Sequence, residues 1–472
     1  MNIRFYNAKI LTLNEQERFD IINGELWVKG DTICYVGESK NPAEICTELQ
    51  MEQPAWEREI DVKGNLLMPG FKNAHAHTYM TFLRSYADDL PLQEWLYQMC
   101  FPKEDKLDTE NIRPLEVLGI MEYLTSGITT SFDMCYFPPV YAQVAAQCGF
   151  RAVQVSGVNS FGGSAAVVEE NYLKVNETSD LTSFMIGFHA EYTTKMELMQ
   201  EIADLAHKYK SPVFLHNSET QNEVKECLER YGKTPTQLTE ELGMYEYGGG
   251  GYHCVYFDDK DFEIFQKRQL TAVTCPASNL KLASGIAPLK RFVEEGIPVA
   301  IGTDGPASNN SLDMFKEMFL ASALAKVREM DAECISADKI LYMATTGGAH
   351  AMGLDNCDRL AAGKKADLIM IDLQQPNMQP ENNIVKNLVY SGSKQNVKLT
   401  MVNGKILYEE QKFSIGFEPA DIYKEANRII RSMEGKRYES NIIYRWCRTG
   451  KSGRTRRIRC RAAVCRCSGQ AA

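Results

Sequence analysis

Short apolar runs alternate with longer segments of helical periodicity through most of this chain. Apolar runs bounded by turn residues are typical of buried strands, and apolar positions repeating every three to four residues are typical of helices. The strand-like runs lie at residues 66–68, 129–132, 152–155, 185–188, 213–215, 252–255, 271–274 and 299–301. Helical patterns such as 198–209 and 262–268 lie between them. This alternation predicts an α/β fold, a (β/α)8 barrel over residues 66–356.

The two ends of the chain have a different pattern. Residues 1–65 and 357–415 alternate apolar and polar positions in the manner of strands, with turn signals between them. The Asn403-Gly404 pair between two apolar runs is a strong hairpin signal. We expect both segments to form one small β-sandwich domain, and residues 416–440 to form an amphipathic helix that packs on the body.

Composition and charge exclude several classes of protein. The chain has 472 residues with 44% hydrophobic and 24% charged side chains, which is typical of a globular protein. A net charge of −10 argues against non-specific nucleic-acid binding. No apolar stretch is long enough to span a bilayer, and the first residues lack a signal-peptide pattern, so we expect a cytoplasmic protein.

The last segment, 441–472, is rich in arginine and cysteine and has no apolar periodicity. A basic nucleic-acid arm and a cysteine metal site are both open interpretations. Cys465-Arg466-Cys467 lacks zinc-knuckle spacing, which favours a disordered or non-native extension.

Four potential metal ligands follow strand-like runs. They are His75, His77, His216 and Asp304. The carboxyl ends of barrel strands surround one mouth, so ligands far apart in sequence can converge on one ion there. Three imidazoles and a carboxylate suit Zn, with Fe or Mn as alternatives, and such an ion can activate water for hydrolysis.

The same residues carry a resemblance to a known family. The string from Met68 to His77 (MPGFKNAHAH), the His216-to-Glu219 spacing, His253 and the turn at 302–305 resemble the amidohydrolase superfamily. The run at 275–285 (CPASNLKLASG) is similar to its 5′-methylthioadenosine/S-adenosylhomocysteine deaminase branch, which includes chlorohydrolase relatives. The resemblance covers about residues 1–435 and implies a TIM-like metal-dependent hydrolase barrel.

The resemblance also implies catalytic roles. Glu219 would contact the ring N1 and shuttle protons, although spacing alone also allows a helix-cap carboxylate. His253 would polarise the attacking water or the developing oxyanion, where a buried structural histidine is the alternative. Asp304 would be both metal ligand and proton acceptor, or else a helix N-cap. The segment at 185–191 has no lysine for a second metal, so one divalent ion is expected.

Further residues are expected to bind substrate. By resemblance, Glu94 would bind the ribose hydroxyls, His189 the purine N3 side, and Ser308 lies at a pocket position. A solvated helix residue, a core histidine and an N-cap are the respective alternatives. Arg151 is the one arginine near the third strand, and residues 160–166 offer no second one for a homocysteine carboxylate. Neutral 5′-substituents are therefore expected.

The sequence thus predicts a metal-dependent aminohydrolase. It would deaminate C6 of 5′-methylthioadenosine, 5′-deoxyadenosine, adenosine or S-adenosylhomocysteine. The alternatives are a hydrolase of another aminated or chlorinated heterocycle, such as an s-triazine or a guanine-like ring, and a catalytically dead scaffold. The expected partner is a small nucleoside rather than a nucleic acid or a membrane, and a homo-oligomer stays open.

Overall fold

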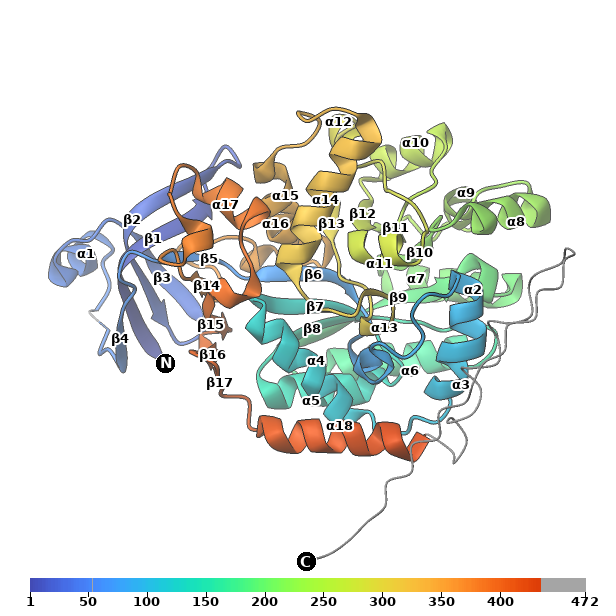
Figure 1. Cartoon of the computed structure of the whole chain (residues 1–472), viewed down its shortest axis with the longest axis horizontal. Helices are drawn as coiled ribbons and strands as arrows, with labels where there is room; N and C mark the ends of the chain where they lie inside the picture. Colours follow the sequence, from blue (N-terminus) through green and yellow to red (C-terminus); the bar gives the residue numbers. More distant parts are fainter. Residues whose placement is uncertain (53, 434–472) are drawn as a thin grey trace, which may run out of the picture.

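Two sheets organise the molecule. The computed structural model describes residues 1–52 and 54–433. Within them lie an eight-stranded sheet and a nine-stranded sheet. Figure 1 shows the nine-stranded sheet at one end of the molecule and the eight-stranded sheet, surrounded by helices, at the other. The predicted architecture, an α/β barrel plus a small β domain built from both ends of the chain, is confirmed.

The eight-stranded sheet is the barrel. Its strands are β6 (Phe71–Ala76), β7 (Ile128–Met134), β8 (Arg151–Val155), β9 (Thr182–Ala190), β10 (Val213–Asn217), β11 (Gly249–His253), β12 (Thr271–Thr274) and β13 (Val299–Ile301). Neighbours pair in parallel and in chain order. The ends of β13 and β6 meet where the Asp304 N–H donates to the His75 carbonyl at 3.0 Å. The carboxyl ends of all eight strands therefore surround one mouth of the barrel.

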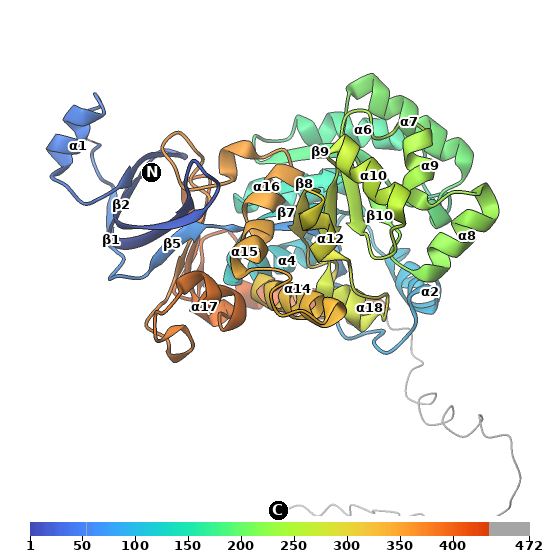
Figure 2. The same cartoon turned by 90° about the horizontal axis from the view of Figure 1, so that it is seen from above.

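Helices cover the outside of the barrel, as the view from above shows (Figure 2). The segments after β6 are η1 (Thr78–Leu83), α2 (Leu92–Glu94), the π-helical η2 (Trp95–Cys100), α3 (Phe101–Glu104) and α4 (Arg113–Thr125). Those after β7 to β11 are α5 (Pro138–Cys148), α6 (Ala165–Asn176), η3 (Glu191–Thr193), α7 (Met196–Tyr209), α8 (Gln221–Tyr231), α9 (Pro235–Glu241) and α10 (Asp259–Arg268). Those after β12 and β13 are α11 (Pro276–Lys281), α12 (Leu289–Glu294), α13 (Pro306–Asn309), α14 (Met314–Glu329), α15 (Ala337–Ala344) and α16 (Thr346–Ala351).

The small β domain joins both ends of the chain. Its strands are β1 (Asn2–Leu13), β2 (Phe19–Lys29), β3 (Thr32–Gly37), β4 (Arg58–Asp61), β5 (Leu66–Pro69), β14 (Leu368–Ile371), β15 (Val397–Val402), β16 (Lys405–Glu409) and β17 (Lys412–Phe413). Smaller elements are α1 (Pro42–Glu48), η4 (Asp355–Cys357), η5 (Pro376–Met378), α17 (Ile384–Tyr390) and η6 (Lys394–Asn396). The N-terminal strands meet the C-terminal ones where β5 pairs antiparallel with β14. Apolar side chains from both ends, including Phe5 and Met401, form its core.

The strand expected at 66–68 forms, but it is not a barrel strand. It is β5, which pairs with β1 and β14 in the nine-stranded sheet. The barrel begins just after it in sequence, with β6 following Gly70. A Cβ at Gly70 would lie 2.1 Å from the Thr129 side chain, so only glycine fits at this passage between the sheets.

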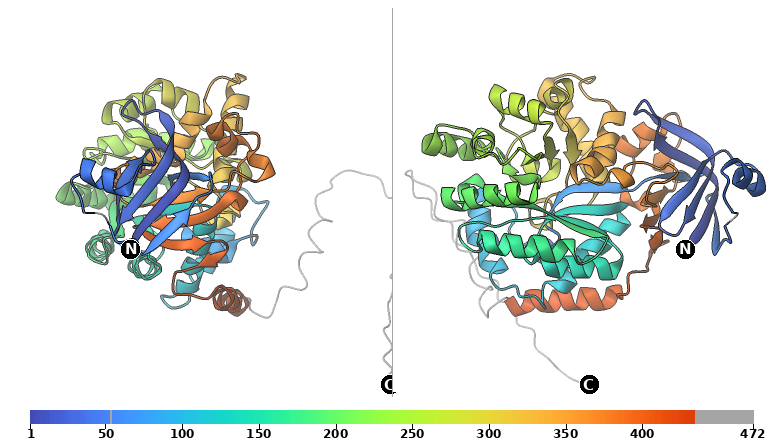
Figure 3. Two further views of the ribbon diagram at one scale, coloured as in Figure 1. Left: turned by 90° about the vertical axis from the view of Figure 1, so that its left-hand side faces the viewer. Right: turned by 180° about the vertical axis from the view of Figure 1, so that it is seen from behind.

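One helix follows the small domain. α18 (Pro419–Met433) buries Ile422, Ala426 and Ile429 and packs against α4, along the lower edge in the right-hand view of Figure 3. The remainder of the helix predicted over 416–440, and the whole Arg/Cys segment 441–472, lie outside the described residues. Among the described helices, none has the length and apolar character needed to cross a membrane.

Candidate metal centre and active-site cavity

The four predicted metal ligands converge at the mouth of the barrel. His75 lies on β6, His77 directly follows it, His216 lies on β10, and Asp304 follows β13. One ligand atom from each lies within 4.8 Å of every other. The His75 and His77 Nε2 atoms are 3.2 and 3.4 Å from His216 Nε2, and 3.6 and 3.4 Å from Asp304 Oδ1. No other such cluster is found among residues 1–52 and 54–433.

Backbone carbonyls orient two of the imidazoles. His77 Nδ1 lies 2.8 Å from the Met134 carbonyl, and His216 Nδ1 lies 2.8 Å from the His189 carbonyl. A carbonyl only accepts, so each Nδ1 donates its proton and each Nε2 turns a lone pair toward the cluster. Burial lowers the pKa of His75, His77 and His216, and the neighbouring histidines lower those of His75 and His216 further. Converging imidazoles whose burial disfavours the charged form, two of them with an Nε2 lone pair turned toward the cluster, fit a divalent cation.

Asp304 is held as a carboxylate by its surroundings. Ser278 and Ser308 donate to its Oδ2 at 2.5 and 2.9 Å, and the Gly305 N–H donates to Oδ1 at 2.7 Å. Burial alone would raise the pKa of Asp304, but His253, His77, Ser278 and the Gly305 N–H lower it below the ordinary range. The residue has φ 59°, a left-handed conformation that costs energy in a non-glycine residue. The backbone bond to His75 fixes this conformation, which aims the carboxylate at the three imidazoles.

Glu219 lies beside the cluster, just beyond β10. The turn that carries it is held by Glu223, whose carboxylate accepts from the N–H groups of Ser218 and Glu219 at 3.0 and 2.7 Å. Glu219 Oε1 accepts from Ser284 at 3.0 Å, and Oε2 lies 3.9 Å from His253 Nε2. Burial and the nearby Asp304 raise its pKa, and His253 and Ser284 only partly offset this. Glu219 is therefore more readily protonated than an ordinary glutamate, as a proton donor beside the cluster requires.

His253 ends β11, whose first residues must be glycines. A Cβ at Gly249 would lie 2.0 Å from the Val213 carbonyl oxygen, and one at Gly250 2.1 Å from the Thr271 carbonyl oxygen. The glycines thus let β11 pass closely between β10 and β12. His253 has φ 71°, and its Nδ1 lies 2.7 Å from Asn279 Oδ1 on α11. Its Nε2 therefore faces Glu219 and the cavity.

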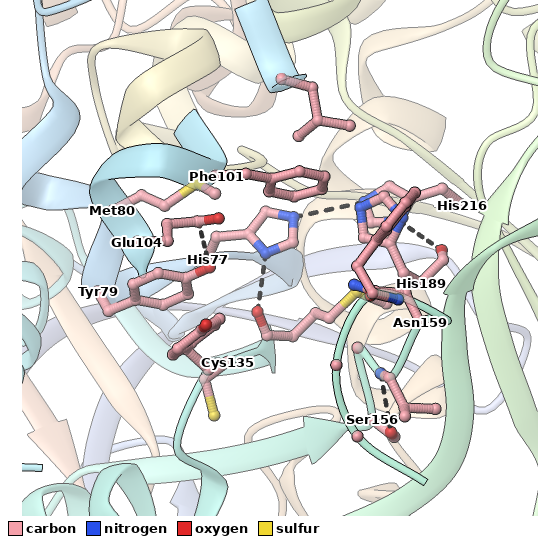
Figure 4. A pocket seen from close by; sticks show the side chains of 18 of the residues that line it. His77, Tyr79, Met80, Phe101, Glu104, Cys135, Ser156, Asn159, His189 and His216 are labelled. Atoms are coloured by element: carbon pink, nitrogen blue, oxygen red, sulfur yellow. Dashed lines mark hydrogen bonds between the residues drawn. The ribbon is translucent and has the colours of Figure 1, made fainter. Parts of the chain in front are cut away.

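A cavity of about 640 Å³ opens from this cluster. His77, His189, His216, Glu219, His253 and Asp304 line its inner end. Aromatic and aliphatic side chains dominate the remainder, and within residues 1–52 and 54–433 no lysine or arginine lines the cavity. In Figure 4, Phe101 and Asn159 border the cavity beside His77, His189 and His216. His189, predicted to contact substrate, lines the cavity, and its Nδ1 lies 3.0 Å from the Thr193 hydroxyl.

The carboxylate expected at Glu94 is not in the cavity. Glu94 ends α2 with its side chain exposed, although its neighbours Leu92 and Trp95 line the wall. Glu104, at the end of α3, lines the cavity instead, is buried, and accepts from the Tyr79 hydroxyl at 2.7 Å (Figure 4). Glu104 was not predicted from the sequence. The signal available was a carboxylate just after the largely apolar run from Trp95 to Pro102, on the same connection as Glu94.

Two other expected substrate contacts lie outside the cavity wall. Arg151 begins β8, at the end of the strand far from the mouth, and pairs in the interior with Asp367 at 2.7 Å. Its guanidinium joins the barrel to the small domain and does not line the cavity. Ser308 is also absent from the wall, because its hydroxyl is used to hold Asp304. Its contribution is to hold the carboxylate of Asp304, one of the four predicted metal ligands, in position.

A parallel barrel with a buried three-histidine, one-aspartate cluster and a neighbouring acid defines a metal-dependent hydrolase. A model described as "Amidohydrolase family" matches residues 66–407. The chain belongs to the amidohydrolase family, and the predicted enzyme class is confirmed.

Two curated relatives are similar over most of their length. The chain is 36% identical over 451 residues to the 5-methylthioadenosine/S-adenosylhomocysteine deaminase of Caldanaerobacter subterraneus subsp. tengcongensis, covering 91% of this chain and 99% of the relative. It is 37% identical over 376 residues to the 5′-deoxyadenosine deaminase of Methanopyrus kandleri, covering 78% and 87%. A solved structure of an adenosine deaminase from Xanthomonas campestris with bound zinc superimposes with a TM-score of 0.84 at 29% identity, covering 92% and 98%.

Proposed function

We propose that the protein is a metal-dependent aminohydrolase that removes the C6 amine of 5′-substituted adenosines as ammonia. The observation that carries this proposal is the position of Glu219, buried at the inner end of the cavity beside the four-ligand cluster. Hydrolytic deamination needs such an acid next to the metal, because an amine leaves poorly unless it is protonated. The names of the two curated relatives agree with this reaction.

His75, His77, His216 and Asp304 would hold one divalent ion. We infer zinc, the metal in the solved adenosine deaminase to which the chain is similar. A bound ion of this kind lowers the pKa of a coordinated water toward neutrality and so supplies a nucleophile.

Residues of the chain itself would carry out the proton transfers. Replacing the amine requires a C–O bond to form at C6, the C–N bond to break, and a proton to reach the leaving nitrogen. Glu219 would donate a proton to ring N1, which makes C6 more electrophilic, and would later carry a proton to the amine. Asp304 would accept a proton at its carboxylate, and His253 Nε2, which turns its lone pair toward the site because Nδ1 donates to Asn279, would accept a hydrogen bond from the attacking water and orient it.

Glu104 would bind the sugar. A carboxylate can accept two neighbouring hydroxyls, and the bond from Tyr79 leaves acceptor capacity on Glu104. Glu104 belongs to the segment that follows β6, whereas Glu219 follows β10, and both line the same cavity. A nucleoside could therefore place its base at Glu219 and its ribose at Glu104. His189 would contact the purine ring.

The cavity favours neutral 5′-groups. Among the described residues, no lysine or arginine lines it, and Glu104 and Asp105 both do. The carboxylate of S-adenosylhomocysteine would have no cationic partner there and would lie near two acidic side chains. We therefore rank 5′-methylthioadenosine, 5′-deoxyadenosine and adenosine above S-adenosylhomocysteine.

The test is the loss of adenine absorbance with zinc-loaded protein and these four nucleosides. Glu219→Gln should lower kcat by about 100- to 10,000-fold while zinc stays bound. Glu94→Gln, a matched change at the exposed carboxylate, should leave kcat nearly unchanged. Zinc binding without turnover of any nucleoside would overturn the proposal in favour of another heterocycle, and absence of zinc binding would favour a dead scaffold.

A further inference from the structure

The outer part of the cavity wall is aromatic and partly uncovered. Phe161, between β8 and α6, is 69% exposed, Val167 on α6 is 45% exposed, and Tyr97 on η2 is 38% exposed. All three line the same cavity as the metal ligands, together with Phe101 of α3. Exposing large apolar side chains to water costs about 25 cal/mol for each Å², so an apolar group that covers them binds favourably.

These rings form a continuous path to the catalytic end. The ring centroid of Phe161 lies 5.9 Å from that of Tyr97 and 6.2 Å from that of Phe101. Phe101 in turn lies 6.4 Å from His189, whose ring is 4.7 Å from that of His216. Phe101 thus separates the inner, polar end from the outer, apolar end. A ligand that has its base beside His216 can extend along these rings toward the exposed Phe161.

The charged side chains on the cavity wall limit which chemical groups such an extension of the ligand can carry. In the part of the chain that the structure describes, the cavity wall carries Glu104 and Asp105 and no lysine or arginine. The polar groups nearest in sequence to Phe161 that line the cavity are neutral, Ser156 and Asn159. Burying an anionic extension would cost its hydration free energy without a cationic partner to offset the loss. An alkyl or aryl group has no such desolvation cost.

We propose that Tyr97, Phe101, Phe161 and Val167 form a subsite for a bulky apolar group on the 5′-carbon of the substrate, such as a long alkyl or an aryl thioether. This inference rests on the proposed function and extends it from the reacting ring to the other end of the substrate. The inner residues hold the ring that reacts, and the outer subsite selects the 5′-group. Methylthio is then too small to cover the exposed rings.

The experiment compares 5′-methylthio-, 5′-butylthio- and 5′-benzylthioadenosine as substrates of the zinc-loaded full chain. Each buried methylene is worth up to about fourfold in kcat/KM, so the butyl and benzyl compounds should exceed the methyl compound by about tenfold or more, mostly through KM. Phe161→Ala should reduce the benzyl-to-methyl ratio by about tenfold. Phe319→Ala is the matched control, because Phe319 is 47% exposed on α14 and does not line the cavity.

The outcomes separate the two proposals. Turnover of all three compounds with equal kcat/KM, or a benzyl-to-methyl ratio that Phe161→Ala leaves unchanged, overturns the subsite while the deaminase remains. No turnover of any of them overturns the proposed function, and the subsite with it.

Discussion

Asn279 Oδ1 lies 2.7 Å from His253 Nδ1, and this bond determines which nitrogen of the imidazole faces the cavity. An amide oxygen only accepts, so Nδ1 carries the proton that it donates, and Nε2 points toward Glu219. Without the bond, the ring could rotate or change tautomer. Asn279 is buried on α11, the short helix that also carries Ser278, the donor to Asp304.

We expect Asn279→Ala to lower kcat by about 10- to 100-fold with little change in KM, because it affects orientation and not the affinity for substrate. Steady-state kinetics on protein of measured zinc content would check this. Asn427→Ala, on the exposed face of α18, is the control. A raised KM with an unchanged kcat would show that Asn279 does not act through His253.

The sequence predicted the metal ligands because a general rule positions them. Carboxyl ends of parallel strands meet at one mouth, so His75, His216 and Asp304 could be placed together before any contact was known. The same rule could not assign the run at 66–68 to a sheet. Whether that run pairs with β1 and β14 or with β7 is decided by contacts with residues far along the chain.

Substrate contacts were less predictable because they depend on side-chain packing. Glu94 and Glu104 lie on one connection, and only the packing of α3 over the mouth buries the second and leaves the first in solvent. The sequence could not exclude Arg151 as a substrate contact, because the residue that pairs with it, Asp367, is 216 residues away along the chain. Ser308, expected to contact substrate, lies beside the cavity and its hydroxyl donates to Asp304.

The Arg151–Asp367 pair predicts a stability effect without a catalytic one. Both side chains are buried, so Arg151→Met would leave an unpaired carboxylate and reduce the free energy of unfolding by about 3–5 kcal/mol. Urea unfolding would measure this, and Arg151→Met with Asp367→Leu should recover part of the loss. KM for methylthioadenosine should not change in the folded variant. A raised KM at unchanged stability would return Arg151 to the substrate site.

The raised pKa of Glu104 predicts that substrate binding depends on pH. Burial raises the pKa of Glu104 to about 7, and the bond from Tyr79 partly opposes this. The carboxylate needed for two hydroxyls forms as the pH rises through about 7, so KM for adenosine should fall between about pH 6 and about pH 8. A dideoxyadenosine that lacks both ribose hydroxyls should not show this fall in KM. Tyr79→Phe removes the lowering effect and should move the adenosine profile to higher pH; parallel profiles for both nucleosides would contradict the assignment.

Metal removal should cost both activity and stability. Without an ion, three imidazoles and a carboxylate lie close together in the interior, and a ligand that binds only the folded state at about 100 times its Kd stabilises it by about 2.7 kcal/mol. A chelator should therefore abolish turnover and lower the Tm in calorimetry, and added zinc should restore both. His77→Ala should prevent the zinc-dependent rise in Tm. A Tm that zinc does not change would argue against the four-residue site.

The most direct measurement is the fate of the oxygen and nitrogen at C6. Zinc-loaded protein would be incubated with 5′-methylthioadenosine in water enriched in oxygen-18, and the nucleoside product and ammonia would be quantified. The account predicts one labelled oxygen bonded to C6 of the product and one ammonia for each turnover, and release of both at least about 100-fold slower with Glu219→Gln. Zinc-loaded protein that releases no ammonia from any adenine nucleoside, or product without label from water, would contradict it.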